Sequence, residues 1–128
     1  MPKFAYLDTF SVIWLAEGKL DKLSRAALDA VNEYDLLVSP FVGYELSLLR
    51  EKKTVLRSAS AILRQLKTQL GVEVCAHPLI DIAEVAASES WTRDPMDRMI
   101  VAHARANKYS PLVSSDRAIR ANYPPTIW

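Results

Sequence analysis

The sequence has 128 residues, half of them hydrophobic, and a formal net charge of +1, which suits one domain with one core over residues 1–128. No segment approaches the roughly 18 uncharged apolar residues that span a bilayer, and charges from Lys19 onward interrupt any signal-peptide core. Cys75 is the single cysteine, which excludes an internal disulfide and a thiolate metal cluster, so we expect a cytoplasmic protein without a membrane partner.

The first half of the chain alternates apolar runs with helical patterns. The run Phe4-Ala5-Tyr6-Leu7 predicts a buried strand. Ser39-Pro40 places a capping hydroxyl before a proline at the first helical position, a strong signal for a helix start. In chain order we predict a strand over 3–8, helices over 9–17 and 23–33, a strand over 36–38, and helices over 40–52 and 54–70.

The second half repeats this alternation. Asp94-Pro95 is another cap followed by proline, and Asp116 can cap a short final helix. We predict a strand over 72–75, helices over 80–88 and 95–107, a strand over 111–114 and a helix over 116–121. Strands that alternate with helices indicate a mostly parallel sheet with helices on both faces, a three-layer α/β/α domain. Ligands of such sheets bind outside the carboxyl ends of the strands.

Four acidic residues are predicted at that edge. Asp8 ends the first strand and Asp116 follows the fourth, although each could simply cap the next helix. Glu45 is harder to explain as a surface residue, because apolar residues lie three and four positions to either side of it and place it on the core-facing stripe. Asp97 shares a face with apolar residues and also suits the first turn of its helix electrostatically.

Four converging carboxylates repel each other unless cations lie between them. Hard oxygen ligands of this kind suit Mg²⁺ or Mn²⁺ and not zinc. Two such ions about 4 Å apart stabilise both the attacking and the leaving oxygen of a phosphodiester. The sequence therefore predicts a nuclease whose metal site and catalytic residues are Asp8, Glu45, Asp97 and Asp116.

A basic segment precedes an acidic one over residues 71–97. Cations outnumber the single Glu51 between residues 50 and 67, and they include Arg50, Lys52, Lys53 and Arg57. Solvated helix faces explain this pattern, and so does a basic rim that guides RNA. The two histidines, His77 and His103, are assigned to packing or to the surface.

These residues resemble the PIN-domain family and specifically its VapC-type toxin branch. Similar segments of this chain are Tyr6-Leu7-Asp8-Thr9, Ser39-Pro40 with Glu45, Arg93-Asp94-Pro95-Met96-Asp97-Arg98, and Leu112-Val113-Ser114-Ser115-Asp116. Ser114 stands where threonine is commoner in the family, and Met96 where phenylalanine is. The resemblance implies a PIN-like fold and a Mg²⁺ site formed by Asp8, Glu45, Asp97 and Asp116.

The resemblance also implies supporting roles. Thr9 and Ser114 are expected to supply hydroxyls beside the metal site, and Asp94 is assigned to helix capping. Arg98 is expected either to hold a phosphate or to pair with a neighbouring acid.

We therefore expect a Mg²⁺-dependent endoribonuclease, the toxin of a type II toxin–antitoxin pair. Its partners are then an RNA substrate and an antitoxin protein, with a homodimer left open. One alternative is a free-standing PIN nuclease in RNA processing. The other is a catalytically silent PIN fold that serves as a binding module.

Overall fold

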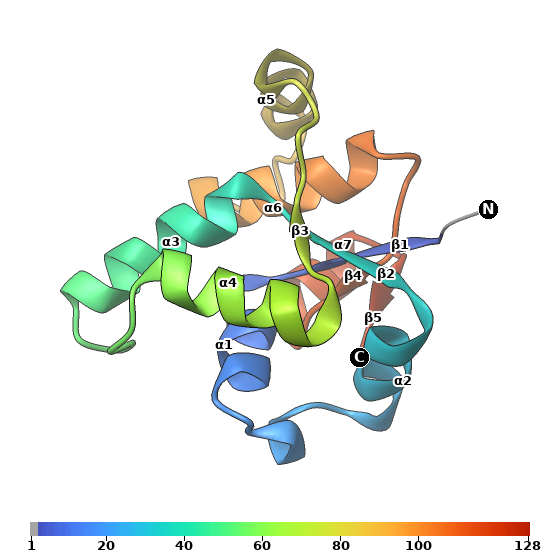
Figure 1. The fold of residues 1–128 in the computed structure, drawn as a ribbon. Coiled ribbons are helices and arrows are strands. Elements are labelled where there is room, and N and C mark those ends of the chain that lie inside the picture. Colours follow the sequence, from blue (N-terminus) through green and yellow to red (C-terminus); the bar gives the residue numbers. More distant parts are fainter. Residues whose placement is uncertain (1–2) are drawn as a thin grey trace.

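Five strands pair in parallel across the middle of the computed structural model, which describes residues 3–128 (Figure 1). Their order in the sheet is β3-β2-β1-β4-β5, and Tyr6 of β1 lies opposite both Leu37 of β2 and Leu112 of β4. The strands are β1 (Phe4–Leu7), β2 (Asp35–Val38), β3 (Glu73–Val74), β4 (Leu112–Val113) and β5 (Thr126–Ile127).

Helices connect the strands and cover the sheet. In Figure 1, α1 and α2 lie on one side of the strands and α5 and α6 on the other. The predicted three-layer α/β/α arrangement is confirmed, and residues 1 and 2 of the predicted domain lie outside the described residues. The helices are α1 (Thr9–Ala16), α2 (Arg25–Glu33), α3 (Pro40–Glu51), α4 (Ala59–Leu70), α5 (Leu79–Ala87), α6 (Pro95–Ala106) and α7 (Arg117–Asn122), with a 3₁₀ turn at Leu20–Lys22.

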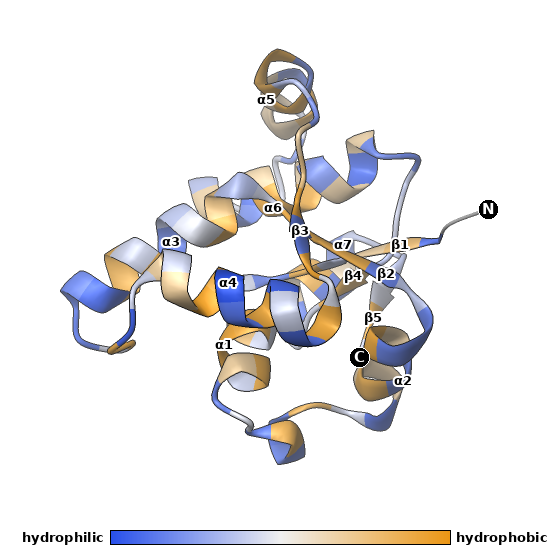
Figure 2. Ribbon diagram, viewed as in Figure 1, coloured by the Kyte–Doolittle hydropathy of each residue, from blue (hydrophilic) through white to orange (hydrophobic). Residues whose placement is uncertain are grey.

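The core forms where the central strand meets the apolar helix faces. Ala5, Tyr6 and Leu7 of β1 are fully buried, as expected for a strand covered on both faces. Figure 2 shows hydrophobic residues along the strands, whereas hydrophilic residues cover much of the outward side of α4. Among residues 3–128, no helix has the length and hydropathy needed to cross a membrane.

The two predicted cap-and-proline signals are confirmed. The Ser39 hydroxyl accepts a hydrogen bond from Phe41 N at 3.1 Å, and Pro40 is the first residue of α3. Asp94 accepts from Met96 N at 2.9 Å and Asp97 N at 3.2 Å, and Pro95 begins α6. These caps matter for function because they fix where Glu45 and Asp97 project from their helices.

Two predicted helix starts were wrong, and one strand was missed. The helix predicted over 54–70 begins only at Ala59, because the Ser58 hydroxyl caps Ala61 N at 3.1 Å. The helix predicted from residue 23 likewise begins after its own cap, Ser24. Strand β5 was not predicted, since two prolines precede its two residues and it forms only by pairing with β4.

The order of the strands creates a crevice at one point of the sheet. The chain moves from β1 to β2 and then β3 in one direction, and returns to place β4 on the opposite side of β1. Connections therefore diverge between the carboxyl ends of β1 and β4, where open parallel sheets bind their ligands. Asp8 immediately follows β1, and Ser114 immediately follows β4.

Candidate active site

A cavity of about 230 Å³ opens beside the carboxyl ends of β1 and β4. All four acids predicted for the metal site line it, although they come from four separate segments of the chain. The lining residues are Asp8, Thr9, Phe10, Glu45, Asp94, Asp97, Ile100, Ser115, Asp116 and Ile119.

Asp8 and Asp116 each cap a helix and also line the cavity. One oxygen of Asp8 accepts a hydrogen bond from Ser11 N at 2.9 Å, and one oxygen of Asp116 accepts from Ile119 N at 2.9 Å. A carboxylate has a second oxygen with further acceptor capacity. The capping role and the site role considered for these residues are therefore compatible.

Glu45 faces the cavity from the second turn of α3. Its side chain is half-buried and accepts a hydrogen bond from the Thr9 hydroxyl. Thr9, only 3% exposed, is the first residue of α1 and directly follows Asp8. Its hydroxyl thus links the β1 end of the cavity to α3.

Asp97 projects from the first turn of α6, and Asp94 lies beside it on the cavity wall. The sequence assigned Asp94 to capping alone, and its hydrogen bonds to the α6 main chain confirm that role. Its position on the wall was missed. The available signal was its spacing, because a cap three residues before Asp97 presents its carboxylate at the same helix end.

Burial and mutual repulsion disfavour the charged forms of these acids. Burial raises the pKa of Asp8, which is only 8% exposed, and the negative charge of Asp116 adds to this effect. The pKa of Glu45 is also raised, by burial and then by Asp94 and Asp8. For Asp97, burial followed by repulsion from Asp94, Asp116, Glu45 and Asp8 raises the pKa to about 7.

These side chains fit a hard cation by donor type and by charge. They supply only carboxylate and hydroxyl oxygens, the ligands that Mg²⁺ and Mn²⁺ prefer. A cation among them would remove the repulsion that raises the pKa of Asp97. As the side chains stand, no three His, Cys, Asp or Glu residues within 3–128 are grouped closely enough to hold one ion. A shared ion would therefore require these carboxylates to rotate toward it.

Ser114 and Arg98 occupy different surroundings. Ser114 is fully buried, its hydroxyl accepts from Asp116 N at 3.1 Å, and its hydrogen bond to Asp8 acts to lower the pKa of that carboxyl. Arg98 was expected on a phosphate or an acidic side chain. Its Nε donates to the main-chain carbonyl of Glu89 and so anchors the segment that leads into α6, and the phosphate role remains a prediction.

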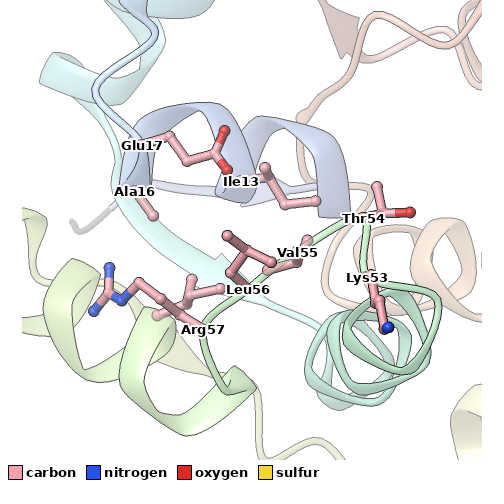
Figure 3. Close-up of a pocket in the computed structure, with 9 residues that line it drawn as sticks. Ile13, Ala16, Glu17, Lys53, Thr54, Val55, Leu56 and Arg57 are labelled. Atoms are coloured by element: carbon pink, nitrogen blue, oxygen red, sulfur yellow. The ribbon is translucent and has the colours of Figure 1, made fainter.

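The basic residues lie apart from the lining of the acidic cavity. Arg50, Lys52, Lys53 and Arg57 are all exposed, at the end of α3 and in the segment before α4. Lys53 and Arg57 line a separate cavity of about 410 Å³, between α1 and the segment that joins α3 to α4 (Figure 3). Apolar side chains of Ile13, Val55 and Leu56 contribute much of its wall.

Comparison with known proteins agrees with this geometry. A chain of the crystal structure of VapBC2 from Rickettsia felis, bound to a DNA fragment from their promoter, superposes with a TM-score of 0.66. The match covers 97% of this chain and 96% of that chain at 16% sequence identity, which shows a shared fold. No curated protein matches the chain significantly.

The family model of the PIN domain matches residues 5–123. That span contains Asp8, Glu45, Asp97 and Asp116, the acids that line the cavity. Because the match extends from β1 to the end of α7, the chain belongs to the PIN domain family.

Proposed function

We propose that this chain is a metal-dependent endoribonuclease and the toxin of a type II toxin–antitoxin pair. The observation that carries the nuclease proposal is the cavity at the β1–β4 crevice, which is lined by the four predicted carboxylates from separate segments. Two of these groups, Asp8 and Glu45, are held by hydrogen bonds to Ser11 N and Thr9. PIN domains are generally nucleases, which agrees with such a site.

Three of the acids share one role in this proposal, and the fourth has either that role or another. Asp8, Asp97 and Asp116 would hold Mg²⁺ or Mn²⁺, and Glu45 would be a further ligand or would orient the attacking water. When bound, the ions supply an activated water and stabilise the charge that develops on the phosphodiester. Hydrolysis of this kind leaves 5′-phosphate and 3′-hydroxyl ends.

The toxin assignment rests on the shared fold with a protein of the VapBC2 complex. By analogy, we propose an antitoxin protein as the partner of this chain. A segment of that partner that fills the groove beside the acids would block the substrate. An arginine could reach the carboxylates there, because their combined negative charge favours a cation.

Cleavage of RNA with and without divalent ions tests the nuclease proposal. RNA incubated with the chain and Mg²⁺ or Mn²⁺ should be cut, and excess chelator should stop the reaction. The new ends should be substrates for an exonuclease that requires a 5′-phosphate. Absence of cleavage with either ion would favour the catalytically silent alternative.

We expect Mg²⁺ to stabilise the folded chain more at pH 8 than at pH 5. The pKa of Asp97 is about 7 in the folded chain, against an ordinary value of 3.8. As pH rises between these values, the unfolded chain loses this proton first, so stability without metal falls across that window. Mg²⁺ binds the folded, deprotonated site and offsets this loss. Melting temperatures with and without Mg²⁺ at both pH values measure the effect.

The variant Glu45→Gln provides the control for this measurement. It keeps an oxygen that can accept from Thr9 but removes one negative charge from the site. Its melting temperature should rise less with Mg²⁺ than that of the wild type. An equal rise in both proteins would place the stabilising ion elsewhere or remove Glu45 from the site.

Reversing two charges at the end of α3 should weaken RNA binding. Arg50 and Lys52 are the suitable pair, because Lys53 has a positive φ of 61° and Arg57 already donates to Gln65 and Ala61. If both cations contact a single strand, Arg50→Glu with Lys52→Glu should reduce the slope of log affinity against log salt by roughly 1 to 1.5.

The matched control reverses Lys3 and Lys22, which are exposed and outside the basic segment. It changes the net charge equally, so it should lower affinity less and leave the salt slope nearly unchanged. The same result from both double variants would assign the basic segment to a solvated face.

A further inference from the structure

Three aromatic side chains form a row that starts at the acidic cavity. Phe10 lines the cavity, and its ring centroid lies 5.9 Å from that of Trp14 at an interplanar angle of 46°. Trp14 in turn lies 6.0 Å from Trp128, at 50°. Both separations fall in the range of favourable aromatic contacts. The row therefore joins the catalytic edge of the sheet to the strand β5 side of the molecule.

The local structure of α1 explains the first contact. Phe10 and Trp14 are four residues apart, so they lie one turn apart on the same helix face. Side chains on a helix tilt toward its N-terminus, which brings the Trp14 ring up against Phe10. Trp14 and Trp128 also pack against the main core, and this packing supports the Phe10 ring from one side.

Phe10 itself remains 44% exposed although it adjoins a strongly polar cavity. A phenyl ring offers nothing to a metal ion that requires oxygen ligands. Nor does it cap or pair with any of the site carboxylates. An exposed ring that rests on Trp14, which itself packs on Trp128, is in contrast what a flat aromatic ligand needs. Every nucleobase has a π-face that stacks on such a ring.

We infer that Phe10 is the stacking platform for one base of a single-stranded nucleic acid, next to the phosphodiester that is cut. This inference rests on the proposed nuclease function and adds a residue that positions the substrate there. Phe10 lies two residues after Asp8, so a base on its ring is close to the carboxylates that would hold the metal. A base paired within a duplex stays stacked on its neighbours and is not free to reach the ring.

A single-stranded RNA oligonucleotide that carries one abasic position tests the inference. The abasic position is moved along the strand, and affinity is measured by fluorescence anisotropy with Mg²⁺ in an Asp8→Asn background, which prevents cleavage. At one position the missing base should lower affinity by about 5- to 100-fold. Phe10→Ala should lower affinity for the intact strand by a similar factor, and in that variant the abasic position should cost nothing more.

Matched variants separate stacking from other effects. Phe10→Tyr keeps an aromatic ring and should bind as the wild type does, whereas Phe10→Leu keeps apolar volume only and should bind as Phe10→Ala does. Tyr44→Ala removes another exposed aromatic, 55% exposed and adjacent to Glu45 but outside the cavity lining, and should change neither affinity nor the abasic profile. Melting temperatures confirm that each variant is folded.

The outcomes distinguish this inference from the nuclease proposal. An abasic profile that is identical in wild type and Phe10→Ala overturns the stacking role, and cleavage by the wild type then leaves the nuclease proposal standing. A Phe10-dependent profile without any cleavage supports stacking and contradicts the nuclease. Weaker binding by Phe10→Ala to duplex and single strand alike also overturns the inference.

Discussion

Replacing Asp8 with asparagine should abolish RNA cleavage while the chain stays folded. The side chain is only 8% exposed and lines the acidic cavity, and among the described residues it forms hydrogen bonds but no ion pair. Loss of a group that merely supports a metal ligand typically costs about 10- to 100-fold in metal affinity or activity, and loss of a ligand should exceed this. The measurement is the rate of RNA cleavage with Mg²⁺ and with Mn²⁺.

Stability provides the control, because asparagine preserves the other role of this residue. Asp8 accepts from Ser11 N at 2.9 Å to cap α1, and asparagine caps helices as well as aspartate does. Burial raises the pKa of the Asp8 carboxyl, which means that its charged form destabilises the folded chain at pH 8. Asparagine removes this charge, so without metal the variant should melt no lower than the wild type. Asp8→Ala loses the cap as well and should cost about 0.5–2 kcal/mol. Cleavage by folded Asp8→Asn at the wild-type rate contradicts the proposed metal site.

The elements that hold the site were predictable because their signals are local. Ser39-Pro40 and Asp94-Pro95 fix the starts of α3 and α6 by capping and by the fixed φ of proline. Neither signal depends on the rest of the fold. Glu45 was predictable for a related reason, since a carboxylate within an apolar helical stripe is costly without a partner.

The details that failed depend on tertiary contacts. Residues 54–58 were predicted to be helical, but they lie before α4, where Val55 is buried in the core and Leu56 is 82% exposed. That alternation is set by packing against α1 and cannot be obtained from helical periodicity. Strand β5 has two residues after Pro124-Pro125, and only its hydrogen bonds to β4 make it a strand.

The chemistry of the site was predictable only in part. Carboxylates at strand ends point to metal, but the sequence gives no reason to place the ring of Phe10 on the same wall or to bring Trp128 against Trp14. The separation between residues 14 and 128 is closed by the β4–β5 pairing, which sequence analysis did not find. Spacing in the sequence identifies candidate metal ligands at one edge of the sheet. Contacts between segments far apart in the sequence can be identified only once the fold is known.

Expression of this chain alone should arrest bacterial growth, and the Asp97→Ala variant should not. Asp97 is the third residue of α6, where loss of an acid costs about 0.3–1 kcal/mol through the helix dipole, and its removal relieves repulsion from Asp94 and Asp116. The variant should therefore stay folded, while a metal site without this ligand loses its geometry.

The matched control for this experiment is Asp81→Ala. Asp81 is likewise the third residue of its helix, α5, but it is exposed and does not line the cavity. Its removal costs the same dipole interaction without touching the site, so this variant should still arrest growth.

Growth curves after induction, with protein levels matched, give the result. Arrest by all three proteins would indicate toxicity from binding or misfolding rather than from cleavage. Arrest by none, together with metal-dependent cleavage in vitro, would favour a nuclease of RNA processing. The toxin assignment requires that the wild type and Asp81→Ala arrest growth and that Asp97→Ala does not. Only that pattern ties the arrest to the Asp97 carboxylate in the cavity.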